Sequence, residues 1–280
     1  MNREAINSSA SDPSAPAWSG DDLARNPHAA PDKARRVERM FAAIAPWYDF
    51  NNRVLSLGLD QRWRKVAVDM ADLQPTDRVA DIACGTGDLT LAFTQRLAKL
   101  NRKAPHLAQP VLGLDFTHAM LPIAKAKSTP TPPHPTTTPP NHPTTYATAD
   151  AMRLPLPDAC VDVVSIAFGI RNVAEPPAAL AEFFRVLRPA GRLVILEFAT
   201  PRNPIARLGN SVYCDHILPR LATLISRDRS GAYHYLPKSI ATFTQPEQLA
   251  EMAQAVGFTA PALRRLTLGT AAVTRLTKPA

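Results

Sequence analysis

A glycine turn between an apolar run and a helix-like segment is the feature of this chain that most restricts its fold. The turn occupies residues 81–88 and reads Asp-Ile-Ala-Cys-Gly-Thr-Gly-Asp. Residues 78–83, which lead into the turn and overlap its start, are mostly apolar. Residues 89–93 after it read Leu-Thr-Leu-Ala-Phe. Gly85 and Gly87 allow a tight bend and a close approach of the backbone to a ligand, because neither carries a Cβ. The pattern predicts a strand, a tight loop and a helix.

The same turn departs from the pattern of a dinucleotide-binding loop. Such a loop reads G-x-G-x-x-G, and its third glycine lets the helix pack close beneath a pyrophosphate. Thr90 stands at that third position. Asp81 and Asp88 place two carboxylates near the loop, which suits a cationic ligand better than a phosphate. S-adenosylmethionine has an ammonium, a sulfonium and no phosphate, so it fits the loop, with Asp81, Gly85 and Gly87 at its site. The loop alone is explained as well by a pair of turn glycines in any α/β protein, and the residues that follow along the chain favour the cofactor.

Strand and helix patterns alternate along the rest of the chain. The predicted strands are 78–83, 111–115, 145–149, 161–167 and 192–198, and the predicted helices are 88–100, 117–127, 176–187 and 246–256. Two β-like runs between residues 260 and 275 predict an antiparallel pair at the sheet edge. Short apolar strands separated by helices are typical of a doubly wound, mostly parallel α/β sheet, here with seven strands. Ligands of such sheets bind at the carboxyl ends of the strands.

Acidic side chains close two further predicted strands. Asp115 ends the run 111–115, where a carboxylate can accept hydrogen bonds from both ribose hydroxyls. Asp150 and Ala151 follow the third strand, where a carboxylate can accept a hydrogen bond from an exocyclic amine such as adenine N6. A helix N-cap explains each acid taken singly. Acids at three successive strand ends after a glycine loop favour a nucleoside site.

Longer segments on both sides of these acids make the chain resemble one family. They are MFAAIAPWYDFNNRVLSLG at 40–58, SIAFGIRNV at 165–173, RVLRP at 185–189, LEF at 196–198 and AYHYLPKSI at 232–240. The loop and strand-end acids are similar to those of the class I S-adenosylmethionine-dependent methyltransferases. The longer segments, over residues 37–275, resemble the ubiquinone/menaquinone biosynthesis C-methyltransferases, which methylate a polyprenylated quinol ring. The resemblance implies a Rossmann-like enzyme that converts demethylmenaquinol to menaquinol, with the benzoquinol step of ubiquinone biosynthesis as the alternative.

The resemblance also implies residues that contact the cofactor. Carried over position by position, they are Thr86, Asp115, Asp150, Ala151 and Ser165. Many relatives have asparagine where this chain has Asp150, and either side chain can serve adenine. Ala190 stands where a second glycine is commoner.

Methylation of a ring carbon requires an electron-rich ring, which is a hydroquinone or its phenolate. The protein must orient the ring and stabilise negative charge on the phenolate oxygen. Arg171 and Asn172, just after the fourth strand, are predicted to do this, because arginine keeps its charge and asparagine can donate a hydrogen bond. The family resemblance implies the same pair, and a surface salt bridge is the alternative for Arg171. Tyr48 lies in the segment expected to close over the cofactor, where it lines the site or only packs. His216 is a weaker candidate for a base in the substrate region. No cluster of histidine, cysteine and carboxylate residues has ligand spacing, so no metal is predicted.

Composition divides the chain into parts. Residues 1–34 are rich in Ser, Ala, Pro and Asp without periodicity, which predicts a disordered tail before a single domain at 35–280. The Pro/Thr-rich stretch 128–145 predicts an inserted surface loop. The region 199–245 interleaves apolar residues with arginines and predicts a substrate-side lid with a channel for an isoprenoid tail, although a core-packing helix explains the pattern almost as well.

Charge and cysteine content bear on partners and compartment. A formal charge of +8 favours an anionic surface, either nucleic acid or lipid headgroups. Much of the charge is spread thinly along the chain, so a solvated basic surface is a strong alternative. Nucleic acid is disfavoured, because residues 165–169 replace the Asn/Asp-Pro-Pro-Tyr motif of base-amine methyltransferases and no basic domain is appended. Three cysteines without metal spacing, and no apolar signal-peptide core, predict a cytoplasmic protein. Arginines in the region 199–245 suit an anionic membrane surface, so peripheral contact with the inner face of the membrane stays open. A different small aromatic acceptor and a homo-oligomer stay open as alternatives.

Overall fold

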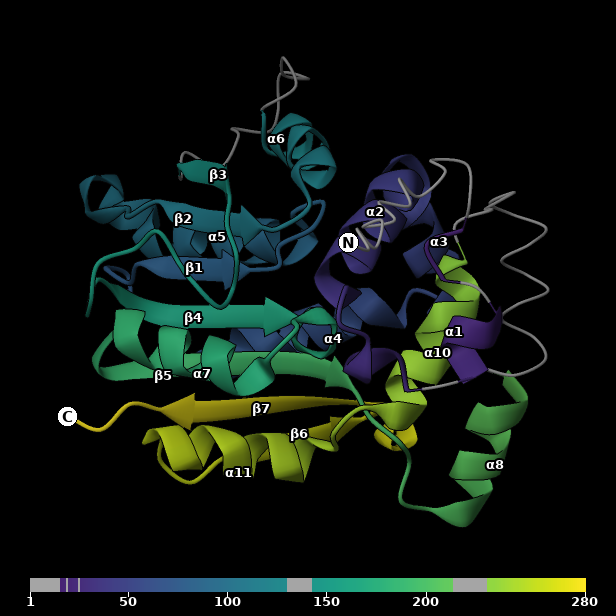
Figure 1. The fold of residues 1–280 in the computed structure, drawn as a ribbon. Coiled ribbons are helices and arrows are strands. Elements are labelled where there is room, and N and C mark those ends of the chain that lie inside the picture. Colours follow the sequence, from purple (N-terminus) through teal and green to yellow (C-terminus); the bar gives the residue numbers. More distant parts are fainter. Residues whose placement is uncertain (1–15, 19, 25, 130–142, 214–230) are drawn as a thin grey trace, which may run out of the picture.

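A computed structural model of the protein describes residues 16–18, 20–24, 26–129, 143–213 and 231–280 (Figure 1). In this part of the chain seven strands form one sheet in the order β3-β2-β1-β4-β5-β7-β6. The strands are β1 (Val79–Ile82), β2 (Val111–Asp115), β3 (Thr144–Thr148), β4 (Val161–Ala167), β5 (Leu187–Phe198), β6 (Ala262–Leu266) and β7 (Ala271–Thr277). Pairs from β3 through β5 are parallel, whereas β7 runs antiparallel to both β5 and β6. The predicted doubly wound, mostly parallel sheet with an antiparallel edge is confirmed.

The glycine turn leaves the sheet where the strand order changes direction. β1 pairs with β2 on one side and with β4 on the other. All four residues of β1 are buried, and Asp81 lies between Gly113 and Ser165 in register. The connection after β1 leads to β2, and the connection after β4 leads to β5, in opposite directions along the sheet. Between them they leave a crevice at the carboxyl ends of the strands, which is where such sheets bind ligands.

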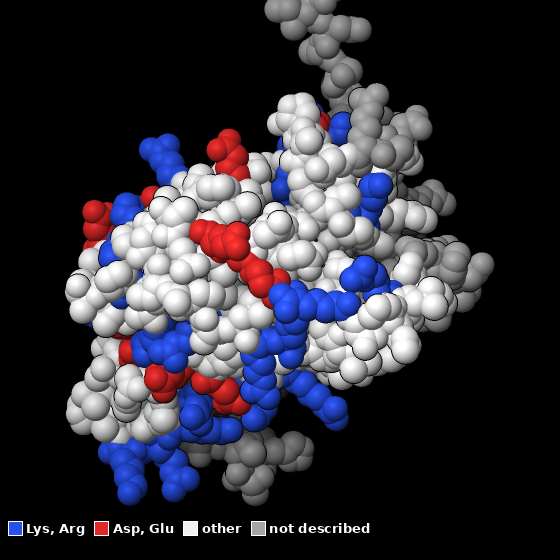
Figure 2. Space-filling model, turned by 90° about the horizontal axis from the view of Figure 1, so that it is seen from below, with Lys and Arg blue, Asp and Glu red and all other residues white. Residues whose placement is uncertain are grey.

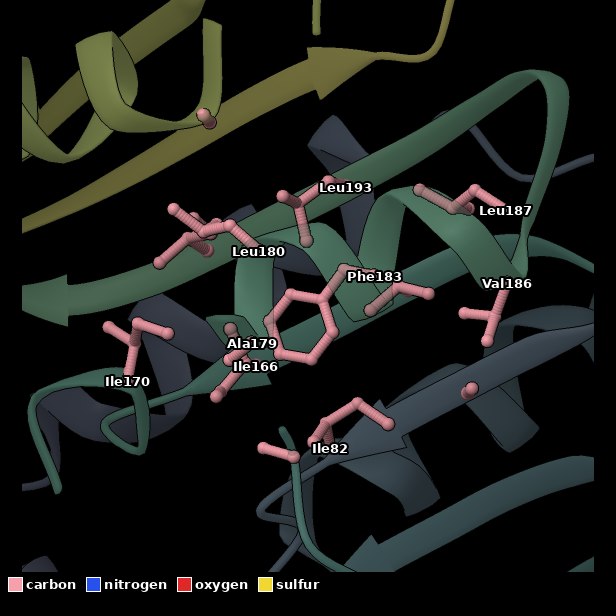
Figure 3. Close-up of a cluster of buried hydrophobic side chains, with 14 of the residues drawn as sticks. Ile82, Ile166, Ile170, Ala179, Leu180, Phe183, Val186, Leu187 and Leu193 are labelled. Carbon is pink, nitrogen blue, oxygen red and sulfur yellow. The ribbon is translucent and has the colours of Figure 1, made fainter. Parts of the chain in front are cut away.

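Two helical layers cover the sheet. In Figure 1, α7 (Pro176–Val186) and α11 (Pro246–Val256) lie in front of it, and α4 (Leu59–Met70) and α5 (Asp88–Leu100) lie behind it. Phe183 and Leu180 of α7 are fully buried in the front core, with Ile166 and Leu193 from the sheet (Figure 3). Each front helix begins at a proline, which suits the first helical position because no N–H partner is needed there.

A third group of helices lies across the carboxyl ends of the parallel strands (Figure 1). It contains α1 (Gly20–Ala24), α2 (Lys33–Ile44), α3 (Tyr48–Leu55), α8 (Pro204–Val212) and α10 (Ala232–Thr242). The remaining described elements are α6 (Leu121–Ser128), which contacts β3, and the short 3-10 turns Pro27–Ala29, Ala45–Trp47, Asn101–Lys103, Pro105–Leu107, His118–Met120, Ile170–Asn172 and Thr267–Gly269.

The described part of the N-terminal segment is ordered against these helices. Trp18 is only 2% exposed and stacks on Tyr235 of α10 with ring centroids 4.8 Å apart. The guanidinium of Arg36 lies 5.4 Å from the centre of the Trp18 ring. Within the predicted tail at 1–34, the described residue Trp18 thus packs on the folded part of the chain, although the composition of the stretch is that of a tail.

Two other predictions fall partly on residues outside the described ranges. Of the predicted insert at 128–145, Ser128 ends α6 and Thr144 begins β3, and most of the rest lies outside. The predicted lid at 199–245 is described at its two ends, as α8 and α10, and His216 lies outside. Among the helices that the structure describes, none is both long enough and apolar enough to cross a membrane.

Candidate active site

The glycine loop and the end of β2 are joined by one carboxylate. The backbone N–H of Gly85 donates to Oδ2 of Asp115 at 2.7 Å, and the N–H of Thr117 donates to Oδ1 at 2.7 Å. Burial raises the pKa of Asp115. Each oxygen accepts one backbone hydrogen bond, and because a carboxylate has about four lone-pair sites, acceptor positions remain for a ligand. Gly85 and Gly87 have φ values of 54° and 83°, and a Cβ on Gly87 would lie 2.8 Å from the hydroxyl oxygen of Tyr146.

Asp81 and Ser165 lie beneath this loop rather than at a cavity wall. The Ser165 hydroxyl donates to Oδ1 of Asp81 at 2.7 Å, and the Thr90 hydroxyl donates to Oδ2 at 2.6 Å. Asp81 and Ser165 are 1% and 0% exposed. These bonds tie the end of β1 to β4 and to α5, so Asp81 and Ser165 support the loop, and direct contact with the cofactor stays a prediction for both.

Asp81 makes stability depend on pH. Burial raises its pKa to about 6 from the ordinary value of 3.8. The folded protein therefore holds this proton more tightly than the unfolded chain, and stability falls as pH rises from about 4 to about 6. The asparagine variant does not titrate here. As pH rises through that window, we therefore expect the free energy of unfolding of Asp81→Asn to increase by about 2 to 3 kcal/mol relative to that of the wild type. Urea unfolding of both proteins at pH 4, 5, 6 and 7 measures this difference, with the exposed Asp69→Asn as control. A constant difference across this range contradicts the prediction.

A cavity of about 100 Å³, here called the cofactor cavity, lies at the ends of β1, β2 and β3. Among the predicted site residues, its walls include Tyr48, Gly85, Asp115, Asp150, Ala151 and Asn172. The carboxylate of Asp150 accepts the N–H of Met152 at 2.9 Å through Oδ1. S-adenosylmethionine fits this set, because a glycine turn without Cβ atoms adjoins two carboxylates with free lone pairs for the ribose and the adenine amine.

A second cavity of about 730 Å³, here called the large cavity, lies under the helices across the sheet end. Its lining is mainly apolar and includes Met40, Ile44, Leu55, Trp63, Phe198 and Leu236. Phe41, Tyr48 and Phe168 line both cavities, so the two cavities meet at these three side chains. Burial raises the pKa of Tyr48, which keeps its phenol protonated at neutral pH.

The two residues predicted for phenolate stabilisation face different cavities. Arg171 lines the large cavity, and its Nη1 donates to Oε1 of Glu197 at 2.6 Å and to the carbonyl of Phe168 at 2.7 Å. Its side chain is 5% exposed, so the pair with Glu197 is buried and the alternative of a surface salt bridge is wrong. Asn172 lines the cofactor cavity, and its side-chain oxygen accepts the Tyr235 hydroxyl at 3.0 Å.

Thr86 belongs to a polar cluster that sequence reasoning missed. Nζ of Lys127 donates to Oδ2 of Asp49 at 2.7 Å and to Asp88, and it lies 3.3 Å from the Thr86 hydroxyl oxygen. The Thr86 hydroxyl donates to Asp49. The neighbouring charge of Lys127 lowers the pKa of Asp88, although burial opposes this. The cluster joins α3, α5 and α6 to the glycine loop, and because Asp49 follows Tyr48 it fixes the start of α3 beside the junction.

The sheet order, the glycine loop at the switch point and the carboxylates at the next two strand ends define a class I S-adenosylmethionine-dependent methyltransferase. A solved S-adenosylmethionine-dependent methyltransferase from Thermotoga maritima has the same fold, with a TM-score of 0.54 at 17% identity over 86% of this chain and 99% of that one. Residues 30–278 match the model of the ubiE/COQ5 methyltransferase family, and the chain belongs to this family.

Relatives of known name cover most of the chain. The demethylmenaquinone methyltransferase of Deinococcus radiodurans is 42% identical over 240 residues, which are 86% of this chain and 91% of that protein. The protein of the same name from Thermus thermophilus is 43% identical over 84% of this chain and 97% of its own length. The ubiquinone/menaquinone biosynthesis C-methyltransferase UbiE of Geobacter sulfurreducens is 38% identical over 86% and 88%. The predicted family is confirmed.

Proposed function

We propose that this protein transfers a methyl group from S-adenosylmethionine to a ring carbon of a polyprenylated quinol and thereby converts demethylmenaquinol to menaquinol. The observation that carries the proposal is the junction at Tyr48 and Phe168, where the cofactor cavity meets the large apolar cavity. A planar ring with an isoprenoid tail needs an apolar cavity of this kind, while its reacting carbon must reach the cofactor side. Two relatives named demethylmenaquinone methyltransferase favour the naphthoquinol over the benzoquinol.

The side chains that line the two cavities have different roles in the reaction. When bound, S-adenosylmethionine supplies the methyl group as a substituent of its sulfonium. Asp115 and Asp150 would hold its nucleoside. Arg171 would hold the quinol oxygen beside the reacting carbon and stabilise the negative charge that makes this carbon nucleophilic. Tyr48 and Phe168 would hold the ring in line and keep bulk water away from the methyl group. After the transfer the ring carbon carries both the methyl group and a hydrogen, and the ring becomes aromatic again when this proton is lost to solvent.

Methyl transfer from labelled cofactor to two reduced substrates tests the proposal. One substrate is short-tail demethylmenaquinol, and the other is the demethylated benzoquinol of ubiquinone biosynthesis. We expect label in the naphthoquinol. Label in both rings would mean that the enzyme serves both pathways. Label in neither ring, with cofactor binding intact, would reject the quinol substrate and leave the methyltransferase family alone.

We also propose that the mouth of the large cavity contacts the cytoplasmic face of the membrane, where a polyprenylated substrate resides. Leu57, Ile205 and Leu268 line this cavity and are nevertheless 77%, 82% and 82% exposed, so they mark its opening. Leu208 and Val212 of α8 are also exposed, at 67% and 46%. Lys and Arg side chains gather on the face of the molecule seen in Figure 2. Arg202 and Arg207 are exposed and are the chain neighbours of Asn203 and Ala206, which line this cavity. An anionic leaflet attracts such basic residues.

Replacing two exposed residues of α8 is expected to weaken this contact. For Leu208→Ser/Val212→Ser we expect about tenfold weaker binding to vesicles that contain anionic lipid, because two apolar side chains no longer enter the headgroup layer. Vesicle sedimentation measures the effect. Leu107→Ser is the control, since Leu107 precedes β2 at the opposite end of the sheet. Equal binding by the double variant and the wild type would show that α8 does not meet the lipid.

A further inference from the structure

A second buried arginine lines the large cavity, on α4. Nη1 of Arg64 donates to Oδ2 of Asp60 at 2.9 Å, and the two side chains are 9% and 6% exposed. Both residues line the large cavity. The first two turns of α4 thus bring a carboxylate and a guanidinium, one helical turn apart, into a wall that is otherwise mostly apolar.

Asp60 is held in place by neighbours on both of its oxygens. The Ser56 hydroxyl donates to Oδ1 at 2.9 Å, and Nε2 of Gln61 donates to Oδ2 at 3.0 Å. With the Arg64 bond, three donors converge on this carboxylate. A carboxylate fixed in this way leaves Arg64 little freedom, so the guanidinium is oriented before any ligand arrives.

Arg64 keeps donors that the protein does not use. Within the described part of the chain its Nε is buried and has no partner, and its hydrogen bonds all leave from Nη1, so Nη2 is unused as well. Arg171 shows the same pattern, with a buried, unpaired Nε and side-chain bonds only from Nη1. Unpaired N–H groups of a buried cation are costly, and the natural partner is an oxygen of a bound molecule.

An aromatic wall connects the two arginines. Cζ of Arg64 lies 5.5 Å from the centre of the Phe168 ring, and Cζ of Arg171 lies 5.2 Å from the centre of the Phe198 ring. The Phe168 and Phe198 rings are 4.6 Å apart, and Trp63 packs against both at 6.1 Å. The two guanidinium groups therefore lie over neighbouring rings of a single aromatic wall of the large cavity.

We infer that Arg64, positioned by Asp60, binds the second oxygen of the quinol, the one remote from the reacting carbon, while Arg171 binds the nearer oxygen. This assignment rests on the proposed function. A ring with oxygens on opposite sides matches a wall with a guanidinium at each end. The site thereby selects rings that carry two oxygens in para positions over rings that carry one, and Arg64 is a specificity-determining residue.

Two substrates that differ in one oxygen test this assignment. They are a short-tail demethylated naphthoquinol and 3-prenyl-1-naphthol, which lacks only the remote oxygen. For Arg64→Met we expect kcat/KM on the diol to fall roughly 10- to 100-fold, the range of a charged hydrogen bond, and kcat/KM on the naphthol to change by less than about threefold. Arg64→Lys keeps the charge and is expected to retain part of the preference for the diol. Lys65→Met is the matched control, because Lys65 is the next residue of α4 and its side chain is 79% exposed.

A merely structural arginine would give a different result. Equal losses on both substrates, or an unchanged ratio, overturn the inference and leave the proposed function in place. Arg64→Met leaves the buried Asp60 carboxylate without its cationic partner, so Asp60→Asn/Arg64→Met is measured beside it. This double variant should lose the preference for the diol to the same extent and unfold at a higher temperature than Arg64→Met. A wild-type enzyme that methylates neither substrate while binding the cofactor overturns the proposed function, and the inference with it.

Discussion

Replacement of Asp115 by alanine is expected to weaken S-adenosylmethionine binding at least about 100-fold, because the ribose loses two hydrogen bonds to a charged acceptor. The carboxylate also fixes the loop. It accepts the N–H of Gly85 and the N–H of Thr117, both at 2.7 Å. Alanine therefore removes the ligand contact and the bond that draws the glycine loop toward β2. Titration calorimetry with S-adenosylmethionine measures the loss.

Asparagine at position 115 tests the role of the charge, because it keeps the shape of the aspartate side chain and removes its negative charge. Both oxygens of Asp115 face a backbone N–H donor, so the amide nitrogen of Asp115→Asn would meet a donor on one side. We expect this variant to bind the cofactor nearly as poorly as Asp115→Ala. Asp69→Ala, on the exposed surface of α4, should bind normally. Unchanged affinity in a folded Asp115→Ala protein would move the nucleoside site away from β2.

Strand and loop patterns predicted most of the fold because they are local. β2, β4, α5 and α11 have the predicted bounds of 111–115, 161–167, 88–100 and 246–256. Each is bounded by residues that act at short range, as Pro246 and Gly257 bound α11. Gly85, Asp115, Asp150 and Ala151 meet at the cofactor cavity for the same reason, since each lies at or just after the carboxyl end of a parallel strand.

Residues that act through distant partners could not be predicted in this way. Lys127 reaches Asp49 across 78 positions, and Arg171 reaches Glu197 across 26. Nothing near Arg64 in the sequence shows that its helix closes over a cavity built mostly from other segments. Trp18 is the strongest case, since its partner Tyr235 follows more than two hundred residues later. For Trp18, the one informative signal is a large aromatic residue in a stretch otherwise composed of small and polar ones.

Replacement of Arg171 by alanine is expected to reduce kcat roughly 100- to 1,000-fold, the range for loss of a group that stabilises developing negative charge. Affinity for the cofactor should stay within a few-fold of the wild type, because Arg171 lines the large cavity and not the cofactor cavity. The same substitution also removes the partner of Glu197, whose side chain is 5% exposed. An uncompensated buried charge costs about 3 to 5 kcal/mol, so the single variant loses stability as well as turnover.

A second substitution distinguishes these two effects. Arg171→Ala/Glu197→Gln removes the stranded charge while glutamine can still accept the N–H of Phe198, which donates to Glu197 at 2.9 Å. We therefore expect the double variant to recover most of the lost unfolding temperature and none of the lost kcat. Recovery of both would make Arg171 a structural residue whose effect on turnover passes through the fold. Equal losses of kcat and of cofactor affinity would instead place its guanidinium at the nucleoside. Loss of turnover in a restored fold is the result that assigns the charge of Arg171 to the phenolate.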